Sequence, residues 1–135
     1  MAEADRVLIV GAGPVGAITG LSLAREGIPV SLFEAAPTPP ADHRAATLHA
    51  ATLDLFAPYG LTAAIIAQGI KSRHFQYRDR VSQEIVAEFD FEVLASICAH
   101  PFVVQLEQHK TVNIVLAAAQ GLPEFQLYGP FVHHP

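Results

Sequence analysis

A short glycine-rich segment near the amino end has the residue types and spacing of a phosphate-binding turn. Residues 11–16 read Gly-Ala-Gly-Pro-Val-Gly and directly follow the apolar run 7–10. A second apolar run, 30–33, ends at the acid Glu34. Strand, glycine turn, helix, strand and acid in this order form the context that the dinucleotide-binding fingerprint requires. The sequence therefore predicts a site for an adenine dinucleotide, and the alternative is a glycine-rich turn of another α/β protein.

Each glycine of this segment has a physical role in such a site. Gly11 permits the tight turn, Gly13 lets a pyrophosphate approach the backbone, and Gly16 lets the helix pack on the strands. Pro14 suits the first turn of a helix, where its missing N–H is no loss. The free N–H groups and the positive dipole end of that helix then face the phosphates.

Glu34 stands where a carboxylate accepts hydrogen bonds from both hydroxyls of the adenosine ribose. The same negative charge repels a 2′-phosphate, so the residue disfavours NADP at this site.

The composition limits the choice of partners. The chain has 135 residues, enough for one domain with a core. Charged residues make up only 16%, against a usual share of about 25%. The net charge is −5 and there is no basic cluster, so nucleic acid and anionic membrane surfaces are poor partners.

Cysteine usage and the amino end predict a cytoplasmic protein without a targeting segment. Cys98 is the only cysteine, which excludes an internal disulfide and fits a reducing compartment. The uncharged stretch 7–24 is long enough to suggest a membrane span. However, glycines and a proline interrupt it, and an acidic segment precedes it. A buried strand followed by a buried helix explains the same apolarity.

Hydrophobic periodicity and breakers predict the other elements. The expected strands are 7–10, 30–34, 102–105 and 125–128, the expected helices are 14–26, 47–59, 62–68 and 107–120, and the expected hairpin pairs 72–79 with 83–91. In the helix 47–59, one face carries Leu48, Ala51, Leu55 and Tyr59. Right-handed crossovers place strand 30–34 beside strand 7–10 and strand 125–128 beyond it.

This strand order leaves the other edge of strand 7–10 open. In dinucleotide folds the first strand lies centrally in the sheet, and an open edge is a liability in water. We therefore expect the chain to be the front portion of a longer protein, and its free edge to allow self-association.

Two further blocks carry a family resemblance. Residues 43–56 read His-Arg-Ala-Ala-Thr-Leu-His-Ala-Ala-Thr-Leu-Asp-Leu-Phe, and residues 101–110 read Pro-Phe-Val-Val-Gln-Leu-Glu-Gln-His-Lys. Together with the glycine turn, they resemble the FAD-dependent aromatic-ring hydroxylases with the p-hydroxybenzoate hydroxylase fold. The likeness extends to about residue 128. It implies an α/β fold: a Rossmann-like βαβ unit with an added antiparallel hairpin.

The resemblance implies roles for single residues. Arg44 matches an arginine that contacts FAD near its pyrophosphate, which suits the multidentate guanidinium. Gln108 resembles a glutamine that begins a helix and reaches the ribityl side, and Gln105 is the alternative. The expected FAD-binding residues are Gly11, Gly13, Pro14, Val15, Gly16, Glu34, Arg44 and Gln108.

The implied activity is the hydroxylation of phenolic rings with NAD(P)H and O₂. The cofactor carries that chemistry, so no catalytic residue is assigned, and no histidine or cysteine has metal-ligand spacing. His49, His100 and His109 are interpreted as structural.

The sequence also departs from the family. It contains neither the Asp-Gly nor the Gly-Asp pair that the family carries later in its sequence. Only the hairpin 72–91 would begin the substrate-domain sheet. We therefore expect residues 1–135 to form a partial FAD-binding domain that is inactive alone. The alternatives are a non-catalytic dinucleotide-binding fragment and a fragment of an NAD-dependent dehydrogenase.

Overall fold

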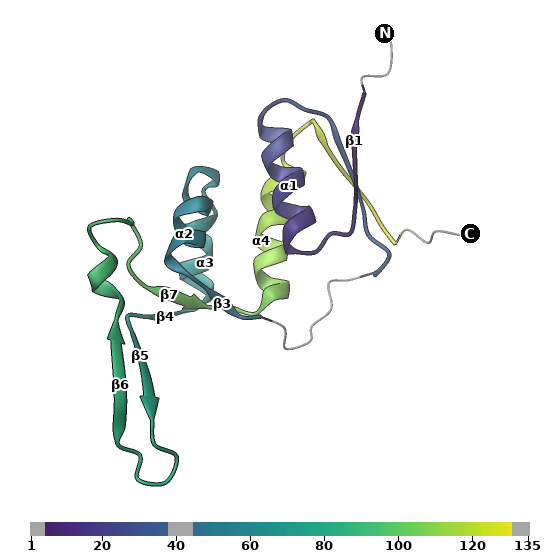
Figure 1. Ribbon diagram of the computed structural model, residues 1–135. Helices are drawn as coiled ribbons and strands as arrows, with labels where there is room; N and C mark the ends of the chain where they lie inside the picture. Colours follow the sequence, from purple (N-terminus) through teal and green to yellow (C-terminus); the bar gives the residue numbers. More distant parts are fainter. Residues whose placement is uncertain (1–4, 38–44, 131–135) are drawn as a thin grey trace. The chain divides into compact units, whose positions relative to one another are not determined.

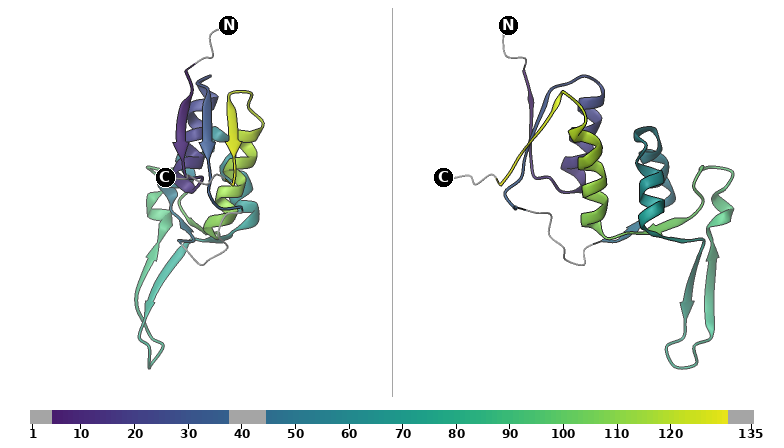
Figure 2. Two further views of the ribbon diagram at one scale, coloured as in Figure 1. Left: turned by 90° about the vertical axis from the view of Figure 1, so that its right-hand side faces the viewer. Right: turned by 180° about the vertical axis from the view of Figure 1, so that it is seen from behind.

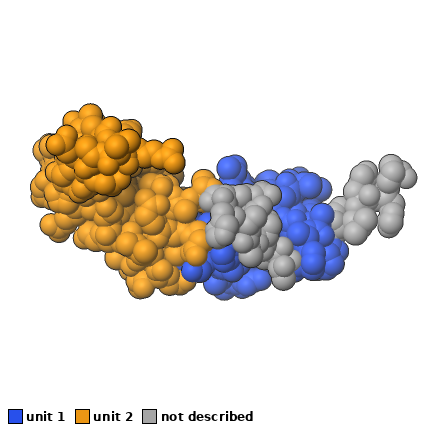
Figure 3. All heavy atoms as spheres, turned by 90° about the horizontal axis from the view of Figure 1, so that it is seen from below, with its two compact units in different colours: residues 1–44, 108–135 blue, residues 45–107 orange. Residues whose placement is uncertain are grey.

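The computed structural model describes residues 5–37 and 45–130 (Figure 1). The chain forms two compact units (Figure 3). Unit 1 consists of residues 1–44 and 108–135, and unit 2 consists of residues 45–107.

Unit 1 contains a three-stranded parallel sheet. Its strands β1 (Val7–Val10), β2 (Val30–Phe33) and β8 (Phe125–Tyr128) lie in the order β1-β2-β8. Both pairings are parallel. The expected strands and their order are confirmed, and β1 is an edge strand within the described part of the sheet.

Two helices cover one face of this sheet. α1 (Pro14–Arg25) and α4 (Gln108–Gln120) pack side by side behind the strands (Figure 2). Both helices begin at the end of the unit where the strands finish, so their amino termini lie at the carboxyl edge of the sheet (Figure 1). This is the arrangement that right-handed crossovers produce.

Small residues on α1 allow the close packing of this layer. A Cβ added at Gly20 would lie 2.8 Å from the Phe125 ring. The core of unit 1 comprises Ala17, Leu21, Ala24, Val30, Leu32, Val112, Val115, Leu116, Ala119 and Phe125. On the opposite face of the sheet, Leu8 and Val10 are 67% and 83% exposed.

Arg6 ties the three strands together at the amino edge of the sheet. Its Nε donates to the Ser31 hydroxyl at 2.9 Å. Its Nη2 donates to the carbonyl oxygens of Val30 at 2.6 Å and Glu124 at 3.1 Å. The guanidinium thus satisfies polar groups on β2 and before β8 from a position just before β1.

Unit 2 packs helices on a small antiparallel sheet. The helices are α2 (Ala50–Phe56), η1 (Ala57–Tyr59) and α3 (Leu61–Gln68). The strands β3 (Thr47–Leu48), β7 (Val103–Gln105) and β4 (Ile70–Ser72) lie in the order β3-β7-β4. No helix among the described residues is long and apolar enough to cross a membrane.

The single helix expected over residues 47–59 is wrong in its start and in its buried face. Thr47 and Leu48 pair with β7, and the helix begins only at Ala50. The helix buries the face that carries Ala50, Leu53 and Phe56, at spacings of three residues, and Leu55 on the expected face is 62% exposed.

A hairpin extends from unit 2. It pairs β5 (His74–Arg78) with β6 (Ile85–Asp90) and is followed by η2 (Phe91–Leu94). One face carries Phe75, Tyr77 and Phe89, whose rings meet edge to face. The hairpin is confirmed, but its expected first strand, 72–79, begins too early. Ser72 is the last residue of β4 and pairs with β7, and β5 begins at His74.

Candidate dinucleotide site

The glycine segment forms the predicted bend from strand to helix. At the end of β1, Gly11 has φ +99°, a backbone conformation that only glycine adopts readily. The Gly11 N–H donates to the Phe33 carbonyl at 2.7 Å, which continues the β1–β2 ladder into the bend.

Gly16 and Gly13 serve this bend in different ways. A Cβ at Gly16 would lie only 1.9 Å from the Gly11 carbonyl oxygen, so glycine is required for α1 to pack against the turn. A Cβ at Gly13 would meet no atom within 4 Å. The space beside Gly13 is therefore open, as the approach of a phosphate to the backbone requires.

The amino terminus of α1 offers free backbone donors. Gly13 is the N-cap and makes no side-chain cap, Pro14 occupies the first turn, and no acid lies in that turn. The first backbone amide of the helix that makes a helical hydrogen bond is that of Ala17, which donates to the Gly13 carbonyl at 2.9 Å. The amides of Val15 and Gly16 are left for an anion, as the helix dipole favours.

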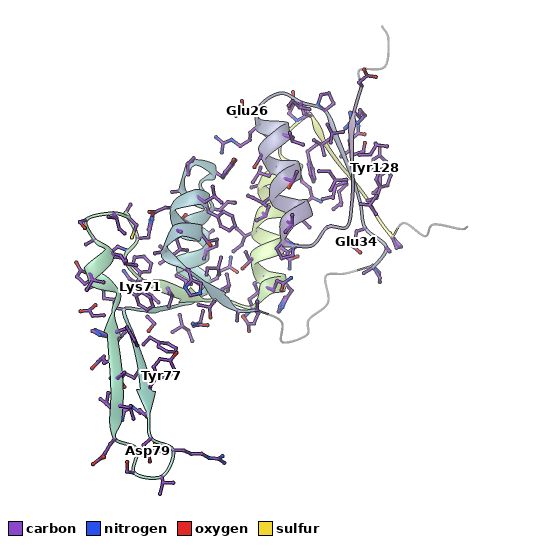
Figure 4. All side chains as sticks on the ribbon, in the orientation of Figure 1. Glu26, Glu34, Lys71, Tyr77, Asp79 and Tyr128 are labelled. Carbon is purple, nitrogen blue, oxygen red and sulfur yellow. The ribbon has the colours of Figure 1, made fainter. Side chains whose placement is uncertain are left out.

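Glu34 lies beside this turn, after the carboxyl end of β2 (Figure 4). Its Oε2 accepts the Ala12 N–H at 2.7 Å and its Oε1 accepts the Ala36 N–H at 2.8 Å. The hydrogen bonds from Ala36 and Ala12 lower the pKa of the Glu34 carboxyl below its ordinary value. The carboxylate stays ionised, and each oxygen keeps acceptor capacity for a ribose hydroxyl.

The two glutamine candidates occupy different places. Gln108 is the first residue of α4 in unit 1. Gln105 lies in β7 of unit 2, where its Oε1 accepts the Thr47 hydroxyl at 2.8 Å. Arg44 lies outside the described residues, so its predicted role stays a prediction.

Sequence reasoning missed the backbone groups that hold Glu34. The amides of Ala12 and Ala36 orient the carboxylate, and no side-chain pattern could have identified them. Glu34 also donates its own N–H to the Tyr128 carbonyl at 2.9 Å, which fixes this position to β8 (Figure 4).

His100, which the sequence analysis interprets as structural, contacts Asp54 in unit 2. Its Nδ1 lies 2.5 Å from Asp54 Oδ1, and the Ala99 N–H donates to Asp54 Oδ2 at 3.0 Å. The His100 contact and the Ala99 bond lower the pKa of Asp54. Within the part of the chain that the structure describes, no cluster of His, Cys, Asp and Glu side chains could hold a metal ion.

The site in unit 1 therefore fits the adenosine-diphosphate half of a dinucleotide. An open backbone turn and free amides suit the diphosphate. The anchored, ionised carboxylate suits the adjoining ribose.

Comparisons with known proteins agree with this geometry. Residues 5–129 match the family model described as "FAD binding domain". The chain is 30% identical over 127 residues to para-nitrophenol 4-monooxygenase of Pseudomonas sp. (strain WBC-3), covering 94% of this chain and 31% of that protein. It is 33% identical over 121 residues to 6-methylpretetramide 4-monooxygenase of Streptomyces rimosus, covering 90% and 21%.

Solved structures give the same result. The p-nitrophenol 4-monooxygenase from Pseudomonas putida DLL-E4 superposes with a TM-score of 0.86 at 27% identity, over 93% of this chain and 31% of that one. Aklavinone-11 hydroxylase in a ternary complex with FAD and aklavinone gives a TM-score of 0.74 at 26% identity, over 93% and 25%. The chain thus spans about a third or less of the length of these relatives. It belongs to the FAD binding domain family, which gives FAD as its cofactor, and it matches the corresponding part of these monooxygenases.

Proposed function

We propose that this chain supplies the receptor for the adenosine-diphosphate half of FAD in a monooxygenase that hydroxylates phenolic rings with NAD(P)H and O₂. The observation that carries the proposal is the Glu34 carboxylate, fixed by the Ala12 amide directly beside the open Gly13 backbone. The relatives named 4-monooxygenases support the reaction class.

Each site residue has a distinct task in this proposal. The amides of Val15 and Gly16 bind the diphosphate oxygens, and Glu34 accepts the ribose hydroxyls. Arg44 adds charge at the diphosphate, and Gln108 contacts the ribityl side. FAD, when bound, supplies the redox chemistry.

The remaining functions belong to the whole protein. The chain matches only about a third of the length of these relatives, and we propose that the phenolic substrate and NAD(P)H bind largely outside the part that it matches. The hairpin within residues 72–91 contributes to the substrate side, and the protein acts in the cytoplasm. The uncovered edge of β1 allows two copies of this chain to associate.

Titration with FAD tests the proposal. Quenching of flavin fluorescence measures FAD affinity, and competition with ADP and with riboflavin shows which half of FAD is recognised. We expect FAD to bind, ADP to displace it, and riboflavin to compete poorly. A chain that binds neither FAD nor ADP would contradict the proposal. A chain that binds ADP but does not bind FAD would favour the alternative of a non-catalytic dinucleotide-binding fragment.

A further inference from the structure

Gly129 directly follows β8 and lies against the backbone of Glu34. A Cβ added at Gly129 would lie 3.2 Å from the Glu34 carbonyl oxygen and 3.8 Å from the Glu34 Cβ. The first distance is tighter than nine in ten contacts that real Cβ atoms make, so one of the two backbones would have to move by a few tenths of an ångström. The absence of a side chain at position 129 therefore leaves the room that Glu34 occupies.

Other reasons for a glycine do not apply at this position. The backbone of Gly129 does not adopt a positive φ like that of Gly11, so a residue with a side chain fits its conformation. Gly129 is also exposed, so it is not held in the core between a helix and the sheet as Gly20 is. Within the part of the chain that the structure describes, the contact with Glu34 is the constraint that remains.

Three backbone groups hold Glu34 and leave it little freedom to adjust. Its N–H donates to the Tyr128 carbonyl at 2.9 Å, so the residue pairs with the end of β8 (Figure 4). Its carboxylate oxygens accept the amides of Ala12 at 2.7 Å and Ala36 at 2.8 Å. Hydrogen bonds weaken when their length and angle change. A shift of the Glu34 backbone would therefore disturb the carboxylate that the proposed function assigns to the ribose.

We propose that Gly129 is a positioning residue for the ribose-binding carboxylate, because its missing side chain lets the chain leave β8 close to Glu34 and keeps that carboxylate beside the glycine turn. The inference rests on the proposed function and adds the carboxyl end of the third strand to the site. Gly129 acts only through Glu34, whose placement sets the affinity for the adenosine half of FAD.

Gly129→Ala tests the inference, with Gly121→Ala as the matched control, since a Cβ at Gly121 would meet a backbone oxygen at an ordinary 3.7 Å. Gly129→Ala is expected to raise the pKa of the Glu34 carboxyl toward its ordinary value, because the hydrogen bonds from Ala36 and Ala12 that lower it are weakened. Titration of the carboxyl carbon chemical shift in the ligand-free chain measures that pKa. Gly121→Ala is expected to leave it unchanged. An unchanged Glu34 pKa in Gly129→Ala would overturn the inference while the proposed function stands.

Titration with ADP tests the link to the ligand. Gly129→Ala is expected to weaken ADP binding roughly 3- to 10-fold, the effect of one impaired hydrogen bond, and Gly121→Ala is expected to leave it unchanged. In the Glu34→Ala background, Gly129→Ala is expected to have no further effect on ADP affinity, because no carboxylate is left to position. An equal effect in both backgrounds would show a general loss of structure and overturn the inference. A parent chain that binds no ADP would overturn the proposed function and this inference together.

Discussion

Gly13 and Gly16 are three residues apart, yet the structure gives them separable roles. Gly16 is needed for folding because an added Cβ would lie 1.9 Å from a backbone oxygen. Gly13 has an ordinary φ of −69° and open space beside it, so its lack of a side chain matters for the ligand.

We therefore expect Gly16→Ala to lower the free energy of unfolding by at least about 2 kcal/mol, because backbone atoms must move. Gly13→Ala should change it by less than about 1 kcal/mol, since alanine is a poorer N-cap than glycine, and should weaken FAD binding by roughly 1–3 kcal/mol. Urea unfolding and FAD titration of both variants measure the two effects. Equal loss of stability in the two variants would contradict this division.

Glu34 makes the stability of the chain depend on pH. Hydrogen bonds from Ala36 and Ala12 hold its pKa below the ordinary value, which is about 4.3 in an unfolded chain. The folded state therefore binds fewer protons in this range. The contribution of Glu34 to stability is complete above that value and is lost as pH falls through the lower pKa of the folded state.

Glu34→Gln should be less stable than the parent chain at neutral pH, because its amide group cannot accept both backbone N–H bonds. The difference should shrink as the pH falls below about 4.3. Urea midpoints of both proteins between neutral and acidic pH provide the measurement, and a gap independent of pH would show that the Glu34 carboxylate is not the titrating group.

Removal of the Glu34 carboxylate is expected to weaken binding of the adenosine half of the ligand. Glu34→Ala should reduce the affinity for ADP by roughly 1–3 kcal/mol, the worth of charge-assisted hydrogen bonds. Isothermal titration with ADP measures this, and an unchanged affinity would remove Glu34 from the ribose.

The residues around Glu34 also show where sequence reasoning ends. The glycine spacing and the acid after the second strand could be read directly, because each depends on a local backbone requirement. The anchoring of the carboxylate by Ala12 and Ala36 could not, because it uses backbone amides that any residue provides.

At the scale of the elements, the turn of the hairpin contains one residue in an unfavourable backbone conformation. Gln83 has φ +61°, a left-handed conformation that disfavours side chains. The turn is held by Asp79, whose Oδ1 accepts the amides of Val81 and Ser82, at 2.8 Å and 2.7 Å.

Gln83→Gly should stabilise the hairpin by about 0.5–1 kcal/mol, because glycine relieves the positive φ. Hydrogen exchange of the Asp79 amide, which donates to the Glu84 carbonyl at 2.9 Å, reports this locally. Ser82→Gly is the matched control and should not slow this exchange. Faster exchange in Gln83→Gly would contradict the prediction.

The elements of unit 1 were more predictable than those of unit 2. β1, α1, β2 and β8 are framed by glycines and follow from local patterns and crossover handedness. β3 and β4 contain only two and three residues. They exist because β7, far along the chain, pairs with both, and such pairing leaves no periodic pattern.

For the molecule as a whole, the open edge of β1 is the most consequential feature. β1 has a strand partner on one side only within the described residues, and no charge or proline interrupts it to discourage pairing. Two residues of β1, Leu8 and Val10, are also exposed on the face of the sheet that the helices do not cover.

We expect concentration-dependent self-association, and we expect Leu8→Lys to reduce it by placing a charge on the edge strand. Sedimentation velocity over a range of concentrations measures this. Val86→Lys, at a residue 72% exposed on the hairpin, is the matched control. A parent chain that stays monomeric at high concentration, or equal effects of both substitutions, would rule out association through β1.

The proposed FAD site is tested most directly by mapping backbone amide chemical shifts as ADP and then FAD are added to the isotope-labelled chain. We expect ADP to shift the amides of Gly13, Val15, Gly16 and Ala12 most strongly, and FAD to add shifts at Gln108, where α4 begins. Shifts concentrated in unit 2, with the glycine turn unchanged, would contradict the proposed site.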